Sequence, residues 1–361
     1  MTGPARPTHA SPGDGMQESK SRFLIIRLSS IGDIVHALPA VAALGETFPQ
    51  AQIDWVVERR YAQLLEGNPF LRRVIKLDTL GWRGRLGSAG TIQDIARGLK
   101  SLREMNYDAA IDFQRLWKSA LIAWLSRSRE RLGFEAHWMR EPAANVLYTE
   151  QIAPRNRYHV IDQNIAIVER LGARVGKWQF PLPSNPEDDR DVERRLAMIG
   201  GGEFLVVNPG GGWRAKCWAP VDYAELLRRL VAEFEYRVLL TGSPNEEELI
   251  HSILDKSSTR RASYFPSTII QFIALARRAR LFVGGDTGPL HLAAAVETPV
   301  VGIYGPTDPK RNGPFAPDDI VLWNRARIDY TRRGNDSEHI AGISVEAVLA
   351  AIHKRLARVY E

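Results

Sequence analysis

A single carboxylate stands near the amino terminus, where a short apolar run gives way to a helical pattern. Residues 23–26 have the apolar character of a buried parallel strand, and residues 29–32 form a small polar turn before Asp33. In an open α/β sheet, ligands bind at the turns that follow the carboxyl ends of strands. Asp33 is therefore a candidate general base, because a carboxylate can accept the proton of an attacking hydroxyl group. The alternative is a helix cap, the commoner role of an aspartate at a helix start.

A glycine-rich turn in the second half has the composition of a phosphate-binding loop. A predicted strand over residues 203–208 runs into a turn that contains Gly210, Gly211, Gly212 and Lys216. Glycines let backbone N–H groups approach phosphate oxygens, and the lysine adds a positive charge. The turn lacks the Gly-Lys-Ser/Thr end of a Walker A loop, whose hydroxyl would hold Mg²⁺. A plain surface turn with the same glycines remains the alternative.

A second turn of this kind runs from Gly284 to His291 and leads into a predicted helix. The backbone amides of Thr287 and Gly288 are candidates for contact with a phosphate group. Asp286 is either part of the same site or an N-cap of the helix. A lone histidine in the first turn of a helix, such as His291, is more often a packed or capping residue than a catalyst.

Basic and aromatic side chains in the first half are candidates for contact with an anionic ligand. The glycine-rich loop over residues 78–90 carries Trp82, Arg83 and Arg85. This loop is either a flexible surface segment or a mobile cover over such a ligand. Arg115 and Lys118 lie close to a predicted helix start, where cations oppose the helix dipole and do not stabilise the helix. A solvated surface pair is the plainer interpretation of these two cations.

The elements that must position these residues alternate between strands and helices along both halves of the chain. Two consecutive halves of this kind predict an α/β protein with two Rossmann-like, doubly wound domains that face each other across a cleft. The 361-residue length also favours two domains. Residues 172–186, with three prolines and two glycines, have the composition of a linker. We expect a disordered tail over 1–20, a first domain over 21–178, a second over 179–340, and a closing helix over 341–361.

Charge and cysteine content narrow the classes of partner and compartment. A formal charge of +6 favours anionic partners, but nucleic acid is disfavoured because no dense basic tract with interleaved aromatic residues occurs. The single cysteine, Cys217, rules out a disulfide framework and fits a reducing, cytoplasmic compartment. Residues 1–20 lack the apolar region of a signal peptide, and no stretch approaches the roughly 20 apolar residues of a membrane span. Any membrane association is therefore expected to be peripheral.

Two further kinds of chemistry are disfavoured by the sequence. The predicted strands are not followed by Gly-x-Gly-x-x-Gly, so a dinucleotide-dependent dehydrogenase fits poorly. Carboxylates and histidines do not occur at convincing metal-ligand spacing, so we expect no metal and no cofactor.

Taken together, these residues resemble glycosyltransferase family 9, the ADP-heptose:lipopolysaccharide heptosyltransferases, and most closely the heptosyltransferase I branch. The motifs that carry the resemblance follow in family order at residues 29–39, 54–58, 106–119, 140–142, 216–218, 286–292 and 304–309. The resemblance departs from the family pattern where Ala219 separates Trp218 from Pro220. It also departs at residues 210–212, where glycines replace hydroxyl-bearing residues of some members.

The resemblance implies a GT-B fold, with an amino-terminal acceptor domain and a carboxyl-terminal nucleotide-sugar domain. It implies an inverting transfer without metal, in which a hydroxyl of Kdo (3-deoxy-manno-octulosonic acid) in Kdo-lipid A attacks the anomeric carbon of ADP-heptose. Asp33 would be the general base, aimed by the turn that contains Ser30 and Gly32. The enzyme would be a cytoplasmic monomer, peripheral on the inner membrane. The rivals are a family member that adds a later heptose or another sugar, and a non-catalytic nucleotide-sugar-binding protein.

The resemblance also assigns the remaining site residues to the two substrates. On the donor side, Lys216 and the amides near Asp286 to Gly288 would stabilise the leaving diphosphate. Glu246 falls near the nucleoside, and His291 falls beside the diphosphate. The donor set is completed by Gly210, Gly211, Gly212 and Thr287. On the acceptor side we expect Ser30, Gly32, Trp82, Arg83, Arg85, Arg115, Lys118 and Arg140.

Overall fold

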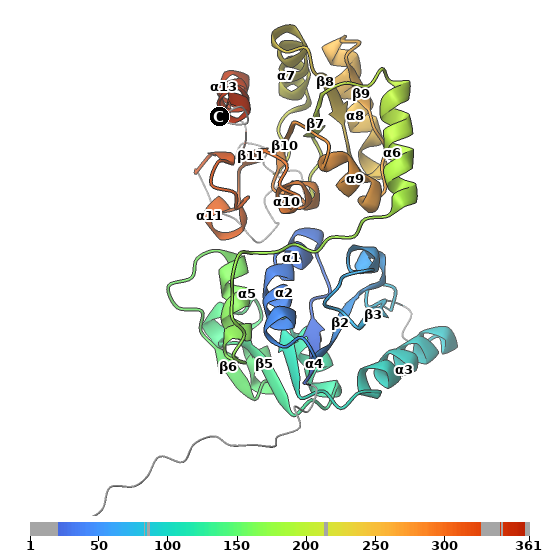
Figure 1. The fold of residues 1–361 in the computed structure, drawn as a ribbon, viewed down its shortest axis with the longest axis vertical. Helices are drawn as coiled ribbons and strands as arrows, with labels where there is room; N and C mark the ends of the chain where they lie inside the picture. Colours follow the sequence, from blue (N-terminus) through green and yellow to red (C-terminus); the bar gives the residue numbers. More distant parts are fainter. Residues whose placement is uncertain are drawn as a thin grey trace, which may run out of the picture.

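The computed structural model describes residues 21–82, 84, 87–212, 216–325, 340 and 342–357. The described chain forms two six-stranded parallel sheets covered by helices (Figure 1), which confirms the predicted pair of Rossmann-like α/β domains. The expected tail over residues 1–20 lies outside the described residues, as do Arg83 and Arg85.

The first sheet has the strand order β3-β2-β1-β4-β5-β6, the doubly wound order of a Rossmann domain. Its strands are β1 (Arg22–Ile26), β2 (Gln52–Glu58), β3 (Arg73–Leu77), β4 (Ala109–Asp112), β5 (Glu130–Phe134) and β6 (Glu150–Ile152). Its helices are α1 (Ile31–Val35), α2 (Leu38–Thr47), α3 (Ala89–Arg103), α4 (Trp117–Leu125) and α5 (Val160–Glu169), with the 3-10 turns η1 (Arg59–Leu64), η2 (Ala136–Trp138) and η3 (Pro142–Leu147). Strands β1 and β4 are buried almost throughout because helices cover both faces of the sheet.

The second sheet has the order β12-β11-β10-β7-β8-β9, which is the same Rossmann order when it is counted from β7. Its strands are β7 (Phe204–Asn208), β8 (Arg237–Leu240), β9 (Ala262–Tyr264), β10 (Leu281–Gly285), β11 (Val300–Tyr304) and β12 (Ile320–Trp323). Its helical elements are α6 (Pro186–Met198), α7 (Pro220–Glu233), η5 (Pro244–Glu246), α8 (Glu247–Ser257), α9 (Ile269–Ala276), α10 (Gly288–Ala295), α11 (Pro309–Asn312) and α13 (Val345–Ala357).

The helix expected to open at Asp33 begins two residues earlier and is divided in two. Helix α1 starts at Ile31, so Asp33 lies in its first turn and does not precede it. Helix α2 starts afresh around Pro39, which has no N–H group to continue the hydrogen-bond ladder of α1. The division sets α1 apart as a short segment at the carboxyl end of β1.

The two sheets are joined by the extended segment after α5 and by direct packing of α1 against α10 (Figure 1). The largest apolar cluster runs through both halves and includes Ile34 of α1 and Leu290 of α10. Because α1 follows β1 and α10 follows β10, the carboxyl edges of the two sheets face each other. Within the described ranges, no helix is both long and apolar enough to cross a bilayer.

Candidate functional site

The site begins with Asp33, and each of its two carboxylate oxygens is held by a neighbouring side chain or backbone group. Oδ2 accepts hydrogen bonds from the Ser30 backbone N–H at 3.0 Å and from the Ser30 hydroxyl at 2.9 Å. Oδ1 forms an ion pair with the guanidinium of Arg27, which is buried below the turn. The Asp33 side chain keeps 42% of its surface exposed, so it remains accessible to a ligand. Asp33 is thus part of a helix cap and also an available carboxylate.

The surroundings of Asp33 hold it ionised. Partial burial opposes ionisation, but the Arg27 guanidinium and the two hydrogen bonds from Ser30 outweigh it. The pKa of the Asp33 carboxyl therefore lies below its usual range. Arg311, from α11 in the second half of the chain, adds to this effect. A carboxylate of this kind is ready to accept a proton at neutral pH, once the proton donor has become acidic in a transition state.

Across the domain interface, Asp286 is the centre of a buried hydrogen-bond network. Its Oδ2 pairs with the ammonium of Lys216 and accepts from the Thr307 hydroxyl at 2.8 Å. Its Oδ1 accepts from His291 Nε2 and from the side-chain amide of Asn312, each at 3.0 Å. Burial disfavours the charge, but Lys216 and His291 more than compensate, so the pKa of Asp286 lies far below its usual range.

This network gives Asp286 a positioning role and corrects one interpretation of it. The N-cap of α10 is Thr287, so the interpretation of Asp286 as the N-cap is wrong. The Thr287 hydroxyl is buried and, among the described residues, has no hydrogen-bond partner. A buried hydroxyl without a partner at a helix N-terminus is suited to a ligand that supplies an acceptor, such as a phosphate oxygen.

Two close contacts bring the Asp33 turn and the Asp286 turn together. A Cβ on Gly32 would lie 2.3 Å from Cδ2 of His291. A Cβ on Gly288 would lie 2.9 Å from Cβ of Ile31. Both distances are shorter than real Cβ contacts, so each glycine is needed for the two helices to meet. The predicted base and part of the predicted phosphate site therefore share one interface.

Two residues of the predicted donor site, Gly210 of the glycine-rich turn and Glu246, also lie together. Glu246 Oε2 accepts from the Ser243 backbone at 2.7 Å and from its hydroxyl at 2.8 Å, while Oε1 lies against Gly210. A Cβ on Gly210 would be 1.9 Å from that oxygen, so this glycine makes room for the carboxylate. A Cβ on Gly212 would meet nothing within 4 Å, and Gly211 lies between the two, just before the undescribed residues 213–215.

The predicted acceptor residues of the first half fall into buried and exposed groups. Arg115 is buried, stacks 3.6 Å above the Phe134 ring and donates to Gln163 Oε1 at 2.9 Å. Burial and the nearby Arg311 and Arg27 lower the pKa of Arg115 to about 9. These contacts hold the Arg115 guanidinium inside the first domain.

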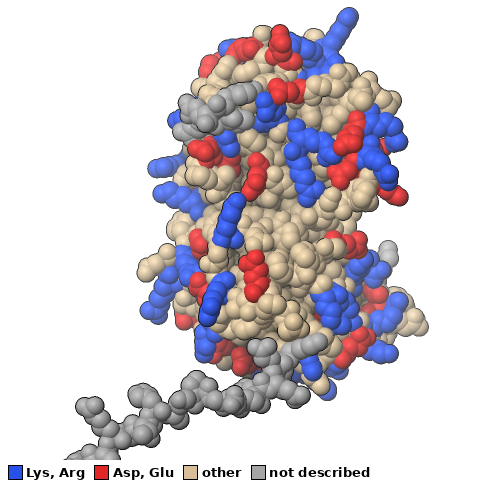
Figure 2. All heavy atoms as spheres, in the orientation of Figure 1, with Lys and Arg blue, Asp and Glu red and all other residues tan. Residues whose placement is uncertain are grey.

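The other described acceptor candidates lie nearer to solvent. Lys118 Nζ lies 3.7 Å from Glu58 Oε1, and the Trp82 indole donates to Asp94 Oδ2 at 3.0 Å. Arg140 is exposed. On the face drawn in Figure 2, basic and acidic side chains are interspersed over both halves. The positive net charge is therefore not gathered into one basic patch on that face.

Several residues of the site were missed by sequence reasoning. Thr307 and Asn312 complete the Asp286 network; Thr307 lies within the motif at residues 304–309, but its type alone assigned it no role. His36 stacks edge-on against His291 with ring centroids 4.5 Å apart. Arg27 follows the predicted strand over residues 23–26, and only the fold brings its guanidinium to Asp33. Within the described residues, no three His, Cys, Asp or Glu side chains form a group that could hold a metal ion.

Comparison with known proteins identifies the family to which this chain belongs. Residues 95–340 match the family model of glycosyltransferase family 9 (heptosyltransferase). The chain is 30% identical to lipopolysaccharide heptosyltransferase 1 of Escherichia coli K12, over 83% of this chain and 92% of that protein. It is 29% identical to lipopolysaccharide heptosyltransferase 1 of Pseudomonas aeruginosa, over 83% of each chain.

A solved structure is similar as well. Escherichia coli heptosyltransferase WaaC with ADP superposes with a TM-score of 0.76 at 26% identity, over 92% of this chain and 99% of that one. The same enzyme with ADP-2-deoxy-2-fluoro heptose gives a TM-score of 0.74. These matches confirm the resemblance drawn from the motifs. The chain is a glycosyltransferase and belongs to glycosyltransferase family 9, the heptosyltransferase family.

Proposed function

We propose that this chain is a heptosyltransferase of lipopolysaccharide core synthesis. It transfers L-glycero-D-manno-heptose from ADP-heptose to a Kdo residue of Kdo-lipid A. The similarity to two lipopolysaccharide heptosyltransferase 1 proteins supports this reaction, and the WaaC complexes support ADP-heptose as the donor. The observation that carries the proposal is the contact of Gly32 with His291, because Gly32 adjoins Asp33 and His291 belongs to the Asp286 network.

In the proposed mechanism Asp33 is the general base. The acceptor hydroxyl oxygen forms a bond to the anomeric carbon from the side opposite the phosphate, and the bond from that carbon to the phosphate oxygen breaks. The configuration of the anomeric carbon is thereby inverted. The hydroxyl proton passes to Asp33 as attack develops, and ADP carries the bonding electrons away. The low pKa of Asp33 suits proton transfer late in this step, because the hydroxyl becomes strongly acidic only then.

The departing diphosphate needs positive charge and hydrogen-bond donors. The Lys216 ammonium, the backbone amides at the start of α10 and the Thr287 hydroxyl would supply them. Lys216 is well suited because Asp286 holds its ammonium in place, so little reorganisation is needed when charge develops. Glu246 beside Gly210 would hydrogen-bond the nucleoside. In this scheme no step requires a metal ion, so EDTA should leave the rate unchanged.

On the acceptor side, Lys118 and Arg140 would meet the acidic groups of the sugar and its phosphates, together with Ser30, Trp82, Arg83 and Arg85. Arg115 would act from beneath this surface, because its guanidinium is bonded inside the domain. We propose that the enzyme acts as a monomer at the cytoplasmic surface of the inner membrane.

One assay tests the proposed reaction. ADP release from ADP-heptose is measured with deacylated Kdo-lipid A and, in parallel, with an acceptor that already carries its first heptose. We expect release with the first acceptor only. Release with the heptosylated acceptor alone would assign the enzyme to a later heptose, and no release with either would contradict the proposal.

A further inference from the structure

The outer face of α4 carries an apolar stripe that the described part of the chain leaves about half exposed. Trp117, Leu121 and Trp124 recur at helical spacing and are 46%, 45% and 53% exposed. The opposite face of α4 is packed against the sheet through Ser119, Ala120, Ile122 and Ala123. The helix is thus anchored to the rest of the domain by its inner face.

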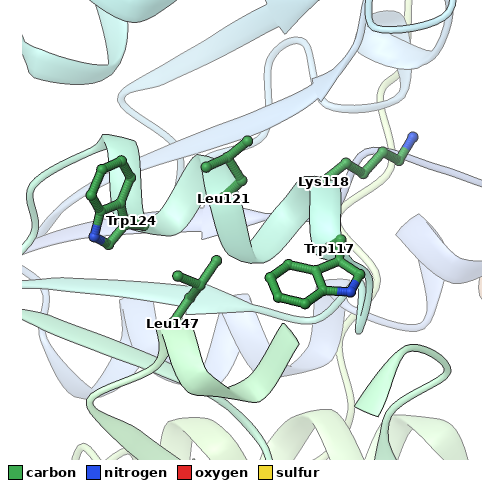
Figure 3. A pocket seen from close by; sticks show the side chains of 5 residues that line it. All are labelled: Trp117, Lys118, Leu121, Trp124 and Leu147. Carbon is green, nitrogen blue, oxygen red and sulfur yellow. The ribbon is translucent and has the colours of Figure 1, made fainter. Parts of the chain in front are cut away.

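The stripe forms one wall of a shallow hollow. Figure 3 shows the side chains of Trp117 and Trp124 towards the two ends of α4, with Leu147 of η3 rising between them and Lys118 extending away. These four residues and Leu121 line a hollow of about 460 Å³. The neighbouring Val146 is 71% exposed. Among the described residues, four of the nine exposed large apolar side chains therefore gather at this one place.

The chemistry of the surface favours lipid over another protein. Tryptophan prefers the boundary between water and hydrocarbon, because its ring is largely apolar while its N–H remains hydrogen-bonded. Basic residues lie near both ends of the stripe. Lys118 is at the start of α4, and Arg103, which donates to Leu125 O at 3.1 Å, is at its end beside the exposed Arg127. An apolar helix face between cations matches an anionic lipid surface.

The stripe is continuous with the proposed acceptor site. Lys118 lines the hollow and also lies 3.7 Å from Glu58, at the carboxyl end of β2 next to β1. Asp33 follows β1 at this same edge of the sheet. A lipid-linked acceptor whose sugar reached Asp33 would thus have its acyl chains towards α4.

We propose that the outer face of α4, together with Leu147, docks on the anionic membrane surface that holds the acceptor. Docking in this way would present the sugar of the acceptor to Asp33 while its acyl chains stay in the bilayer. This inference rests on the proposed function for the identity of the acceptor, but the lipid binding itself can be measured without any substrate.

The test compares the full chain with a Leu121→Ser/Trp124→Ser variant in co-sedimentation with lipid vesicles. The matched control is Met198→Ser/Val221→Ser, which removes two still more exposed apolar side chains from the second half of the chain. We expect the wild type and the control to bind vesicles that contain phosphatidylglycerol, and to bind pure phosphatidylcholine weakly. The α4 variant should bind the anionic vesicles at least about tenfold more weakly than the wild type does.

The α4 variant should keep its turnover on the water-soluble, deacylated acceptor and lose turnover on acceptor embedded in vesicles. Equal vesicle binding by the wild type and the α4 variant would overturn the proposal, as would no binding by either. The oligomeric state is measured by size-exclusion chromatography with light scattering. If the wild type is a dimer and the α4 variant a monomer, the proposal is overturned, because the stripe then binds a second copy of the chain. If the wild type transfers no heptose at all, the proposed function fails while the vesicle result still decides the docking surface.

Discussion

A Cβ atom on Gly32 would lie 2.3 Å from Cδ2 of His291, so the two domains meet where a side chain is absent. His291 is itself fixed, because its Nε2 is hydrogen-bonded to Asp286 of its own domain. The pair therefore links the turn that holds the proposed base to the network that holds Lys216. The spacing between these two parts of the site depends on this contact.

Replacement of Gly32 by alanine should disturb that spacing more than it disturbs folding. The added methyl group must push α1 away from α10 and shift Asp33 with it. We expect kcat to fall by about 100-fold, the usual cost of a displacement of about 1 Å, with a smaller change in ADP affinity. Steady-state kinetics and calorimetry measure the two quantities. Gly90→Ala is the control, since a Cβ there meets nothing within 4 Å. Equal kcat in both variants would show that this contact is unimportant.

Replacement of Asp33 by asparagine should remove proton transfer and retain the donor site. The amide keeps the shape of the carboxylate but cannot accept the hydroxyl proton. We expect kcat to fall by about 100- to 10,000-fold. ADP binding, measured by calorimetry, should change less than about threefold, because Lys216 and the start of α10 are untouched. Turnover close to wild type would rule out Asp33 as the base.

The Asp286 network predicts a graded loss of stability. Asp286→Asn removes the charge that neutralises Lys216 in a largely buried place, so the free energy of unfolding should fall by about 3 kcal/mol. Thr307→Val removes only one hydrogen bond to the same carboxylate and should cost about 1 kcal/mol. Urea unfolding followed by circular dichroism measures both variants. If Thr307→Val costs as much as Asp286→Asn, the ion pair with Lys216 is not the main stabilising interaction of this carboxylate.

The parts of the fold that sequence patterns could predict are those with buried, apolar central strands. Strands β1, β4, β7 and β10 are buried throughout or nearly so, and each has a clear apolar run before a turn. The outer strands β6 and β9 have only three residues each, and β12 is only partly buried. Their apolar signal is short or diluted, so the patterns do not indicate them.

Within the site, sequence motifs indicated which turns matter but not which side chains pair. Asp33 and Lys216 stand out because of their residue type and the turns around them. The ion pair of Asp33 with Arg27 and the hydrogen bond of Asp286 with Asn312 join residues through tertiary packing, which no local pattern records. Arg115 was expected at the surface. Its burial follows from the packing of its guanidinium on Phe134, which is distant in sequence.

The buried histidines at the domain interface predict a loss of stability in mild acid. The His36 ring lies 4.5 Å from that of His291 and 5.6 Å from that of His159, measured between centroids. Burial, and then the neighbouring histidines, lower the pKa of His36 well below its ordinary value, and burial lowers the pKa of His159. The unfolded chain takes up protons near pH 6.5, roughly the ordinary histidine pKa, while the folded chain does so only at lower pH. The free energy of unfolding should therefore decrease as the pH falls below about 6.5, by up to about 1.4 kcal/mol per pH unit for each of these two histidines.

A substitution at His36 isolates its share of this effect. Its Nε2 is buried and has no hydrogen-bond partner among the described residues, so phenylalanine can replace the ring without the loss of a bond at that atom. The urea concentration at the midpoint of unfolding should change less between about pH 7 and pH 5 for His36→Phe than for the wild type. The exposed His137 provides the control, because its replacement by phenylalanine should leave the pH dependence as it is in the wild type. Wild-type stability that is constant over this range would contradict the neutral, buried state of His36. A constant stability in His36→Phe alone would show that His36 carries the whole effect and that His159 contributes little.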